Sequence, residues 1–396
     1  MLFETRKKIS KFCFKIWCKI SPSLSEYFQD YNNFFFFRNE MDPNFPWKKY
    51  IHQKNNYFKQ WGFDVSQLEA EYYSFVSGIK ADHYVNRSMV FHYIYPYLDR
   101  YDFVPAYMDK NIQKKLLSLP DKKNDIVATK DIIYNSNGIF FTHSDEQCSE
   151  EKAIEILLNY GKPLIIKPTV ETFGGHGVEM ISSDLTRETL LSHINKYKRN
   201  FTFQEVIEQH SDLTRFNPSS INTLRIVTYC DFSQQYKILY ACIRFGGEGS
   251  IKDNVCSGGG YTGIDYKTGK LLDKKIYSYH VSQPTNIVDH FPTVIPHWEK
   301  VKTAALILHQ RLPQLKVIGW DFAITPDGKP LFVEFNPRPG IGLQQAVGPM
   351  FSKEDLDELM SHISKSALRQ IPIGVTYFSD YPERKTLHDK FILKNF

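Results

Sequence analysis

The sequence has few cysteines and no long apolar run. Its six cysteines form no C-x-x-C pair and no Cys/His cluster with zinc spacing, which excludes a disulfide framework or zinc fold and predicts buried thiols in a reducing compartment. No segment approaches the ~20 apolar residues that cross a bilayer, so no membrane-spanning helix is expected. The phosphate loop G-x-x-x-x-G-K-[ST] is also missing, which excludes that class of ATPase.

Charge of either sign is in little excess. The 49 Lys and Arg residues against 44 Asp and Glu give a net charge of +5. Over 396 residues this bias suits anionic ligands but is too small to indicate nucleic acid as a partner. Aromatic residues, by contrast, reach 15%, which excludes a disordered or low-complexity chain and allows two or three folded domains.

The first 20 residues predict a basic amphipathic helix rather than an export signal. Lys11, Lys15 and Lys19 interrupt the apolar stretch that a signal peptide needs. Helical spacing gathers four apolar side chains on another face: Ile9, Phe12, Ile16 and Ile20. Such a helix either lies on an anionic membrane surface or packs on the rest of the chain. We expect a cytoplasmic protein, with peripheral membrane contact through residues 1–20 left open.

The pattern of elements predicts an α+β fold with antiparallel sheets and segregated helices. Residues 1–105 are aromatic and helix-leaning, and strands then alternate with helices. The expected strands are 163–167, 178–182, 201–207, 224–231, 236–245, 261–265, 271–279, 317–325 and 331–336, and the expected helices are 183–198, 296–311 and 353–369. Residues 258–263 match the dinucleotide motif G-x-G-x-x-G, but a strand and turn follow where that motif needs a helix, so we reject the match.

The hairpin over residues 317–336 carries the most informative side chains. If it folds symmetrically about Asp327–Gly328, Asp321 lies opposite Glu334. Two opposed carboxylates, with Cβ atoms ~5 Å apart, repel each other unless a divalent cation lies between them. Asn336, two residues beyond Glu334, adds a third oxygen on the same face. Because Asp, Glu and Asn suit Mg²⁺, we expect Asp321, Glu334 and Asn336 to bind it.

The turn leaves a second register open. Pro326-Asp327-Gly328 also suits a three-residue loop with a bulge, which shifts the pairing by one residue. That shift would place Asp321 and Glu334 on opposite faces of the sheet, where each acid would pair with a nearby Lys or Arg. The hairpin alone does not decide between a metal site and separately paired acids.

A glycine-rich segment is the second candidate site. Residues 173–178 hold three glycines within four positions, between two expected strands, and such backbone can approach a phosphate closely. Lys167, seven residues before Gly174, strengthens the phosphate interpretation. A simple tight turn is the alternative.

Taken in order, these motifs resemble the ATP-grasp superfamily, and more narrowly the ATP-grasp proteins associated with sugar transfer. The resemblance covers about residues 105–370, and its most specific part is the block E-F-N-P-R-P-G from Glu334. It implies two α+β subdomains that grip ATP between antiparallel sheets, after a helical, aromatic-rich N-terminal region. The implied division is a helical region at 1–105, an N-terminal ATP-grasp segment at 106–160, a lid subdomain at 161–208, a C-terminal subdomain with the metal site at 209–375 and a tail at 376–396.

The resemblance also implies roles for single residues. Nucleotide contacts are implied at Lys110, Lys167, Gly174, Gly175, His176, Gly177, Gln204, Glu205, Val206, Ile207 and Asp212, with Glu208 as the alternative to Asp212 for the ribose. Cations that would hold phosphate or an acyl phosphate are implied at Arg225, Arg244 and Arg338. Asp253-Asn254 and residues 258–260 resemble the sugar-associated branch as well.

The implied activity is that of an ATP-dependent ligase that joins a carboxylate to an amine through an acyl phosphate. ATP and Mg²⁺, as two ions or with Mn²⁺ in its place, are the implied cofactors. The partners would be a small or sugar-linked carboxylate and an amine, as in amidation of an acidic sugar for surface polysaccharide or capsule. A sugar or polyol kinase and a non-catalytic nucleotide-binding module are the alternatives, and the oligomeric state is not determined by the sequence.

Overall fold

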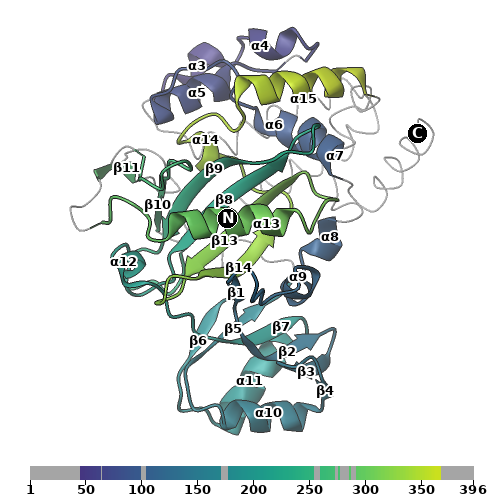
Figure 1. Cartoon of the computed structure of the whole chain (residues 1–396), viewed down its shortest axis with the longest axis vertical. Coiled ribbons are helices and arrows are strands. Elements are labelled where there is room, and N and C mark those ends of the chain that lie inside the picture. Colours follow the sequence, from purple (N-terminus) through teal and green to yellow (C-terminus); the bar gives the residue numbers. More distant parts are fainter. Residues whose placement is uncertain are drawn as a thin grey trace, which may run out of the picture. The chain divides into compact units, whose positions relative to one another are not determined.

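The computed structural model describes residues 45–366 apart from 64, 100–103, 171–176, 254–258, 273–274, 277–284 and 287–290. Figure 1 shows its elements, and the chain divides into two compact units. One unit comprises Met1–Arg100, His280–Ser282 and Ile341–Phe396, and the other comprises Tyr101–Tyr279 and Gln283–Gly340. The helix expected at 1–20 lies outside the described residues. Within the described part of the chain, no helix is long and apolar enough to cross a membrane.

The first unit is helical and built around aromatic side chains. Its elements are α3 (Trp47–Tyr50), α4 (Asn56–Lys59), α5 (Leu68–Ser77), α6 (Arg87–Met89), the π-helical segment η1 (Val90–Ile94), α7 (Tyr95–Leu98), α14 (Gly342–Gln345) and α15 (Lys353–Lys365). Tyr72, Tyr84 and Tyr95 are fully buried. The Gln345 amide group donates to the carbonyl of Val85 and accepts from its N–H, at 2.9 and 2.8 Å, which ties α14 to the N-terminal helices. The expected helical, aromatic-rich N-terminal region is confirmed for its described residues.

The second unit contains two six-stranded sheets. The larger one has the order β1-β14-β13-β8-β9-β10, and only β1 and β14 run parallel. Its strands are β1 (Val127–Ala128), β14 (Pro330–Asn336), β13 (Val317–Ile324), β8 (Thr223–Cys230), β9 (Tyr236–Phe245) and β10 (Gly260–Gly263). Helix α13 (Trp298–His309) packs its buried stripe, which includes Val301 and Leu308, against one face of this sheet. The other face is therefore left for polar side chains.

The smaller sheet, which we call the lid sheet, is antiparallel throughout. Its order is β4-β3-β2-β7-β5-β6. Its strands are β2 (Asp131–Ser136), β3 (Ile139–Thr142), β4 (Gln147–Cys148), β5 (Leu164–Pro168), β6 (Glu179–Ile181) and β7 (Phe201–Glu205). Helices α10 (Glu150–Leu158) and α11 (Arg187–Tyr197) share one apolar core with it. Residues on both sides of position 160 thus belong to one sheet and one core.

Four further elements complete the described part of the second unit: α8 (Val104–Tyr107), α9 (Lys110–Leu116), α12 (Ser211–Thr214) and a two-stranded ribbon of β11 (Lys275–Ile276) and β12 (Thr285–Asn286). The expected α+β class with antiparallel sheets is confirmed. Gly260–Gly263 is a strand paired with β9, which supports the rejection of the dinucleotide motif.

Three expected boundaries were wrong. Helix α11 begins at Arg187, because Thr186 forms a reciprocal capping box with Thr189 that Ser183 and Asp184 do not provide. The strand expected at 201–207 ends at Glu205. The strand expected at 261–265 ends at Gly263, and the predicted turn that follows brings Ile264 into an antiparallel bridge with Leu271.

The described cysteines fit the interpretation of inert thiols. Cys230 and Cys242 are buried and Cys148 is partly buried, and none of the three forms a disulfide. Burial raises the pKa of the Cys242 thiol to about 11, which keeps it protonated near neutrality. Cys13, Cys18 and Cys256 lie outside the described residues.

Candidate functional site

The hairpin of β13 and β14 contains both of the register features that the sequence left open. Its turn is the three-residue loop, since Thr325 N–H donates to the carbonyl of Lys329 and Ile324 pairs with Pro330. A bulge then skips Val333, so that Phe322 pairs with Phe332 but Asp321 pairs with Glu334. The three-residue loop shifts the pairing of the two strands by one residue, and the bulge at Val333 reverses that shift before Asp321 and Glu334. The predicted pairing of Asp321 with Glu334 is confirmed.

Paired positions line up charged side chains across three adjacent strands. Glu334 on β14 lies opposite Asp321 on β13, and Asp321 lies opposite Arg225 on β8. Directly paired residues project from the same face of a sheet, and residues two apart do so as well. Arg244 on β9 and Asn336 on β14 therefore share this face, which is opposite to the face where Trp320 and Phe335 join the apolar core. We call this set the charged row.

Asp321 is the centre of the charged row. Its Oδ1 accepts from Arg225 Nε at 2.5 Å and its Oδ2 accepts from Arg225 Nη2 at 2.9 Å, and Oδ2 also forms an ion pair with Arg244 Nη2 at 3.0 Å. Burial alone would raise the pKa of Asp321, but the two guanidinium groups outweigh it and hold that pKa below its usual value. Asp321 is therefore ionised, and it fixes one edge of each arginine.

Arg244 has two further partners besides Asp321. Thr223, which lies opposite Arg244 in the β8–β9 pair, accepts from Arg244 Nε at 3.2 Å and from Nη2 at 2.7 Å. Asp253 accepts from Arg244 Nη2 at 3.4 Å and from the Thr223 hydroxyl. Burial opposes the charge of Arg244, but Asp321 and Asp253 together raise its pKa above the usual value.

Helix α9 brings Lys110 to the outer end of the charged row. The helix begins at Lys110 after the N-cap Asp109, and Lys110 Nζ lies 3.3 Å from Glu334 Oε2. Gln113, one turn later, donates to the Phe335 carbonyl at 2.7 Å and accepts from the Phe335 N–H at 3.0 Å. Because Phe335 follows Glu334 directly, this double hydrogen bond sets where Lys110 meets the acid.

The same helix contacts the lid sheet. Lys110 N–H donates to the Thr169 carbonyl, just after β5, at 3.0 Å. Lys114 forms an ion pair with Asp131 on β2, and Gln204 Nε2 on β7 donates to the same carboxylate at 2.9 Å. Helix α9 is thus hydrogen-bonded to both sheets of the second unit.

Lys167 lies on β5 of the lid sheet within the electrostatic range of this cluster. Burial lowers the pKa of Lys167 to about 8, the Glu334 and Asp131 carboxylates oppose that shift, and the ammonium groups of Lys110 and Lys114 add to it. Within the described part of the chain, Lys167 forms no direct ion pair. Its partly desolvated ammonium is suited to a ligand that brings negative charge.

The remaining predicted nucleotide residues lie in several places. Val206 and Ile207 follow β7 and are partly buried, and their peptide groups form no hydrogen bond with another described residue. Glu205 N–H donates to the Lys130 carbonyl at 2.9 Å. Gly177 is described, with φ of +74°, and its carbonyl accepts from the Tyr197 hydroxyl. Gly174, Gly175 and His176 lie outside the described residues.

The two ribose candidates and the third arginine lie outside the charged row. Asp212 on α12 contacts its neighbours Arg215 and His210, at 3.7 and 3.9 Å. Glu208 is exposed. Arg338 follows β14 and is partly buried. Their predicted roles remain predictions.

Sequence reasoning missed five residues that build this cluster: Gln113, Lys114, Asp131, Thr223 and Asp253. Asp253 had been noted only for its resemblance to one branch of a family. A signal existed for Thr223, because it lies two residues before Arg225 and so on the same strand face. Nothing in the sequence indicated that Lys114 on α9 reaches Asp131, since that pairing depends on where the helix packs.

The oxygen donors of Asp321, Glu334 and Asn336 suit Mg²⁺ in their chemistry. Asn336 Nδ2 lies 3.5 Å from Asp321 Oδ2, and Glu334 is opposite Asp321, so the three groups adjoin on one face. Across the described ranges no three His, Cys, Asp or Glu side chains form a metal-binding group, so protein ligands would be few. These residues fit an ion that keeps several water ligands.

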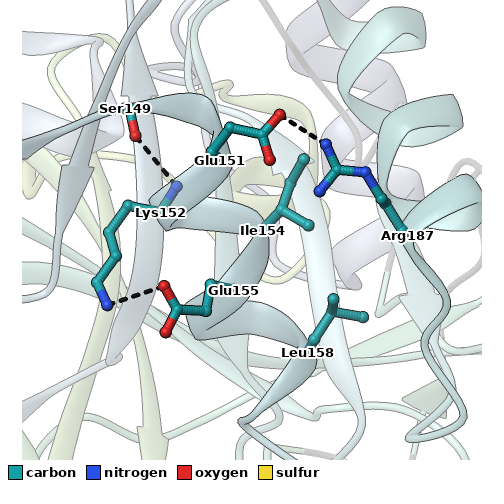
Figure 2. A pocket seen from close by; sticks show the side chains of 7 residues that line it. All are labelled: Ser149, Glu151, Lys152, Ile154, Glu155, Leu158 and Arg187. Carbon is teal, nitrogen blue, oxygen red and sulfur yellow. Dashed lines mark hydrogen bonds and ion pairs between the residues drawn. The ribbon is translucent and has the colours of Figure 1, made fainter.

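A groove on the helices that pack on the lid sheet lies apart from these residues. Figure 2 shows it between α10 and the start of α11, where Glu151 and Arg187 form an ion pair at 2.6 Å above Ile154 and Leu158. The groove contains none of the predicted site residues. The ion pair links α10 to α11, and neither of its residues belongs to the charged row.

The two sheets, with helices packed on each, form an ATP-grasp fold. The chain belongs to the sugar-transfer associated ATP-grasp family, whose model matches residues 91–358. A search among curated proteins finds no match.

Solved structures of similar fold share little sequence with the chain. D-alanyl-alanine synthetase A from Vibrio cholerae is 13% identical, with 66% of each chain covered and a TM-score of 0.41. D-alanine–D-alanine ligase from Bacillus anthracis, complexed with ATP, is 16% identical, with 71% of this chain and 66% of that chain covered and a TM-score of 0.32. The biotin carboxylase domain of a 2-oxoglutarate carboxylase from Hydrogenobacter thermophilus, complexed with MgADP, is 12% identical, with 65% and 45% covered and a TM-score of 0.38. The chain spans about half to two thirds of the length of the solved chains that it matches.

Proposed function

We propose that the chain is an ATP-dependent ligase that joins a carboxylate to an amine through an acyl phosphate. The proposed carboxylate is an acidic sugar, and the product is an amide used in cell-surface polysaccharide. Membership of the sugar-transfer associated ATP-grasp family supports the reaction class.

The observation that carries the proposal is the charge of the cluster around Asp321 and Glu334. Four carboxylates belong to it, those of Asp131, Asp253, Asp321 and Glu334. Five cations face them, those of Lys110, Lys114, Lys167, Arg225 and Arg244. The excess of positive charge, in a partly desolvated site, favours anionic ligands such as a nucleoside triphosphate and a carboxylate.

The reaction divides into two transfers. A carboxylate oxygen attacks the γ-phosphorus of ATP, the bond to the bridging oxygen breaks, and ADP leaves. The amine nitrogen then attacks the acyl carbon, inorganic phosphate leaves, and one proton passes to water. Neither step needs a covalent protein nucleophile, which agrees with the buried, protonated thiol of Cys242.

Four of the five cations then have a defined role in the reaction. Lys110 and Lys167 bind the phosphates, and Arg225 and Arg244 hold the terminal phosphate and the acyl phosphate. Asp321, Glu334 and Asn336 would hold Mg²⁺, which when bound neutralises charge on the transferred phosphate. The peptide N–H and carbonyl groups of Val206 and Ile207, which bond to no other described residue, would form hydrogen bonds with the adenine.

The test is a coupled assay of ADP release across pooled uronic acids and amino acids, with mass spectrometry of the products. The Glu334→Gln protein, purified in parallel, corrects for contaminating ATPases. ADP release that needs both a carboxylate and an amine, with an amide of the summed mass less water, supports the ligase. ADP release with a sugar alone would assign a kinase instead, and ATP binding without any release would assign a nucleotide-binding module.

A further inference from the structure

Two residues outside the predicted site hold Arg244 in a single orientation. Thr223 is 2% exposed, and its hydroxyl receives two N–H groups of Arg244 while donating its own hydrogen to Asp253. A valine at this position would have nearly the same shape but could form none of these hydrogen bonds. Thr223 is therefore part of a polar network, and its role goes beyond packing on the sheet.

Asp253 supplies the second negative charge that two neighbouring arginines require. Arg225 and Arg244 both bond to Asp321, and one carboxylate balances one guanidinium charge. Asp253 brings the set to two cations and two anions. Burial raises the pKa of Asp253 above its usual value, and the adjacent Arg244 offsets only part of that shift. A buried carboxylate next to Arg244 is costly unless it pairs with that arginine.

The contacts of Arg244 are confined to one edge of its guanidinium group. Nε and Nη2 make its hydrogen bonds to Thr223 and Asp253 and its ion pair with Asp321. Its Nη1 has no partner among the residues that the structure describes, and Arg225 likewise uses only Nε and Nη2. Two guanidinium groups are thus fixed along one edge, with an Nη1 group of each left for a ligand.

We propose that Asp253 and Thr223 are positioning residues that hold the Nη1 group of Arg244 toward the terminal phosphate of ATP. The proposal rests on the proposed function, since it takes ATP as the ligand of Arg244. The guanidinium group of Arg244 is already fixed through Nε and Nη2. Its Nη1 can therefore bind a phosphate oxygen without further loss of side-chain entropy, which strengthens that binding. ADP, which lacks the terminal phosphate, gains nothing from this arrangement.

The experiment measures ATP and ADP binding to the full chain by calorimetry in the presence of Mg²⁺. We expect Asp253→Asn and Thr223→Val to weaken ATP binding about tenfold each and to change ADP binding less than twofold, whereas Thr223→Ser keeps the wild-type ATP affinity. Asp231→Asn is the matched control, because Asp231 on the same sheet pairs with Lys237 at 2.9 Å and lies outside the charged row. Thermal unfolding of every variant shows whether the fold is retained.

A double variant separates positioning from general stabilisation. In an Arg244→Lys background, Asp253→Asn should weaken ATP binding by less than twofold further, because the guanidinium group that Asp253 orients is absent. Equal tenfold losses in both backgrounds, or equal losses for ATP and ADP, would overturn the proposal. A wild-type protein that binds no ATP would instead refute the proposed function, so the two failures are distinguishable.

Discussion

Asp321 on β13 lies directly opposite Glu334 on β14 because Val333 is bulged out of the ladder between them and the turn. Without this bulge the three-residue loop would set Val333 against Asp321 and turn Glu334 to the apolar face. The same bulge allows Phe332 and Phe335, three residues apart, to join one apolar core. The single bulged residue therefore places Glu334 on the polar face of the strand and both phenylalanines on its apolar face.

Two opposed acids would destabilise an ordinary sheet. Here Arg225 lies on the far side of Asp321, and Lys110 reaches Glu334 from α9, so each carboxylate has its own cation. Glu334, with 26% of its side chain exposed, is the more accessible of the two acids, and Asp321 is almost wholly enclosed. Glu334 is thus the acid that a ligand would meet first.

We expect Glu334→Gln to abolish turnover while leaving the fold intact. The amide keeps the size of the side chain but removes the charge that would bind a metal ion and that pairs with Lys110, and a loss of at least ~100-fold in kcat is expected. Circular dichroism and thermal unfolding would check the fold. Glu151→Gln, which alters an exposed acid of the α10 groove, should leave kcat unchanged. Activity retained by Glu334→Gln would remove the metal role.

Lys167→Ala should weaken ATP binding. Loss of a partly desolvated ammonium that meets phosphate corresponds to about 1.5–3 kcal/mol, or ~10–100-fold in the dissociation constant. Equilibrium binding of ATP measures it. Lys152→Ala is the control, since Lys152 is an exposed lysine on α10 that pairs with Glu155. Unchanged nucleotide affinity in Lys167→Ala would contradict the assignment of this lysine.

The pKa of Lys167, about 8, predicts a pH dependence. Below pH 8 the side chain is charged and can hold phosphate, and above pH 8 an increasing fraction is neutral, so kcat/KM for ATP should fall as the pH rises. This ratio reports the free enzyme, before ATP itself raises the pKa. In Lys167→Arg the guanidinium stays charged, and the decline near pH 8 should vanish even if the maximal rate is lower. A decline that persists in Lys167→Arg would assign the titration to another group.

Gly328→Ala should destabilise the hairpin that carries the charged row. Gly328 has φ of +82°, and a Cβ atom there would lie 2.5 Å from Nε2 of His297. We expect about 1–2 kcal/mol less free energy of unfolding in a denaturant titration, from backbone strain and from displacement of the exposed His297 ring. Gly138→Ala, with φ of +94° and no atom within 4 Å, isolates the strain alone and should cost about 1 kcal/mol. Equal losses in the two variants would contradict the collision.

The predictable parts of the fold were those that local chemistry determines. Alternating or apolar runs located β5, β8, β9, β13 and β14, and the helix over Trp298–His309 followed from its buried stripe. The start of α11 was misplaced because Ser183, Asp184 and Thr186 are all good N-cap residues. Only one of them has a partner three residues later that closes the capping box.

The sequence by itself determined the order of the chemical groups: two lysines, two arginines and an acid–acid–amide set, each on an element whose type local propensity settles. Only the tertiary structure decided which charges meet. The bulge at Val333 restores the register of Asp321, the packing of Gln113 on Phe335 brings Lys110 to Glu334, and the β8–β9 pairing sets Thr223 beside Arg244. These contacts join residues from 13 to more than 200 positions apart. The balance between desolvation and ion pairing there depends on the folded surroundings and on no local pattern.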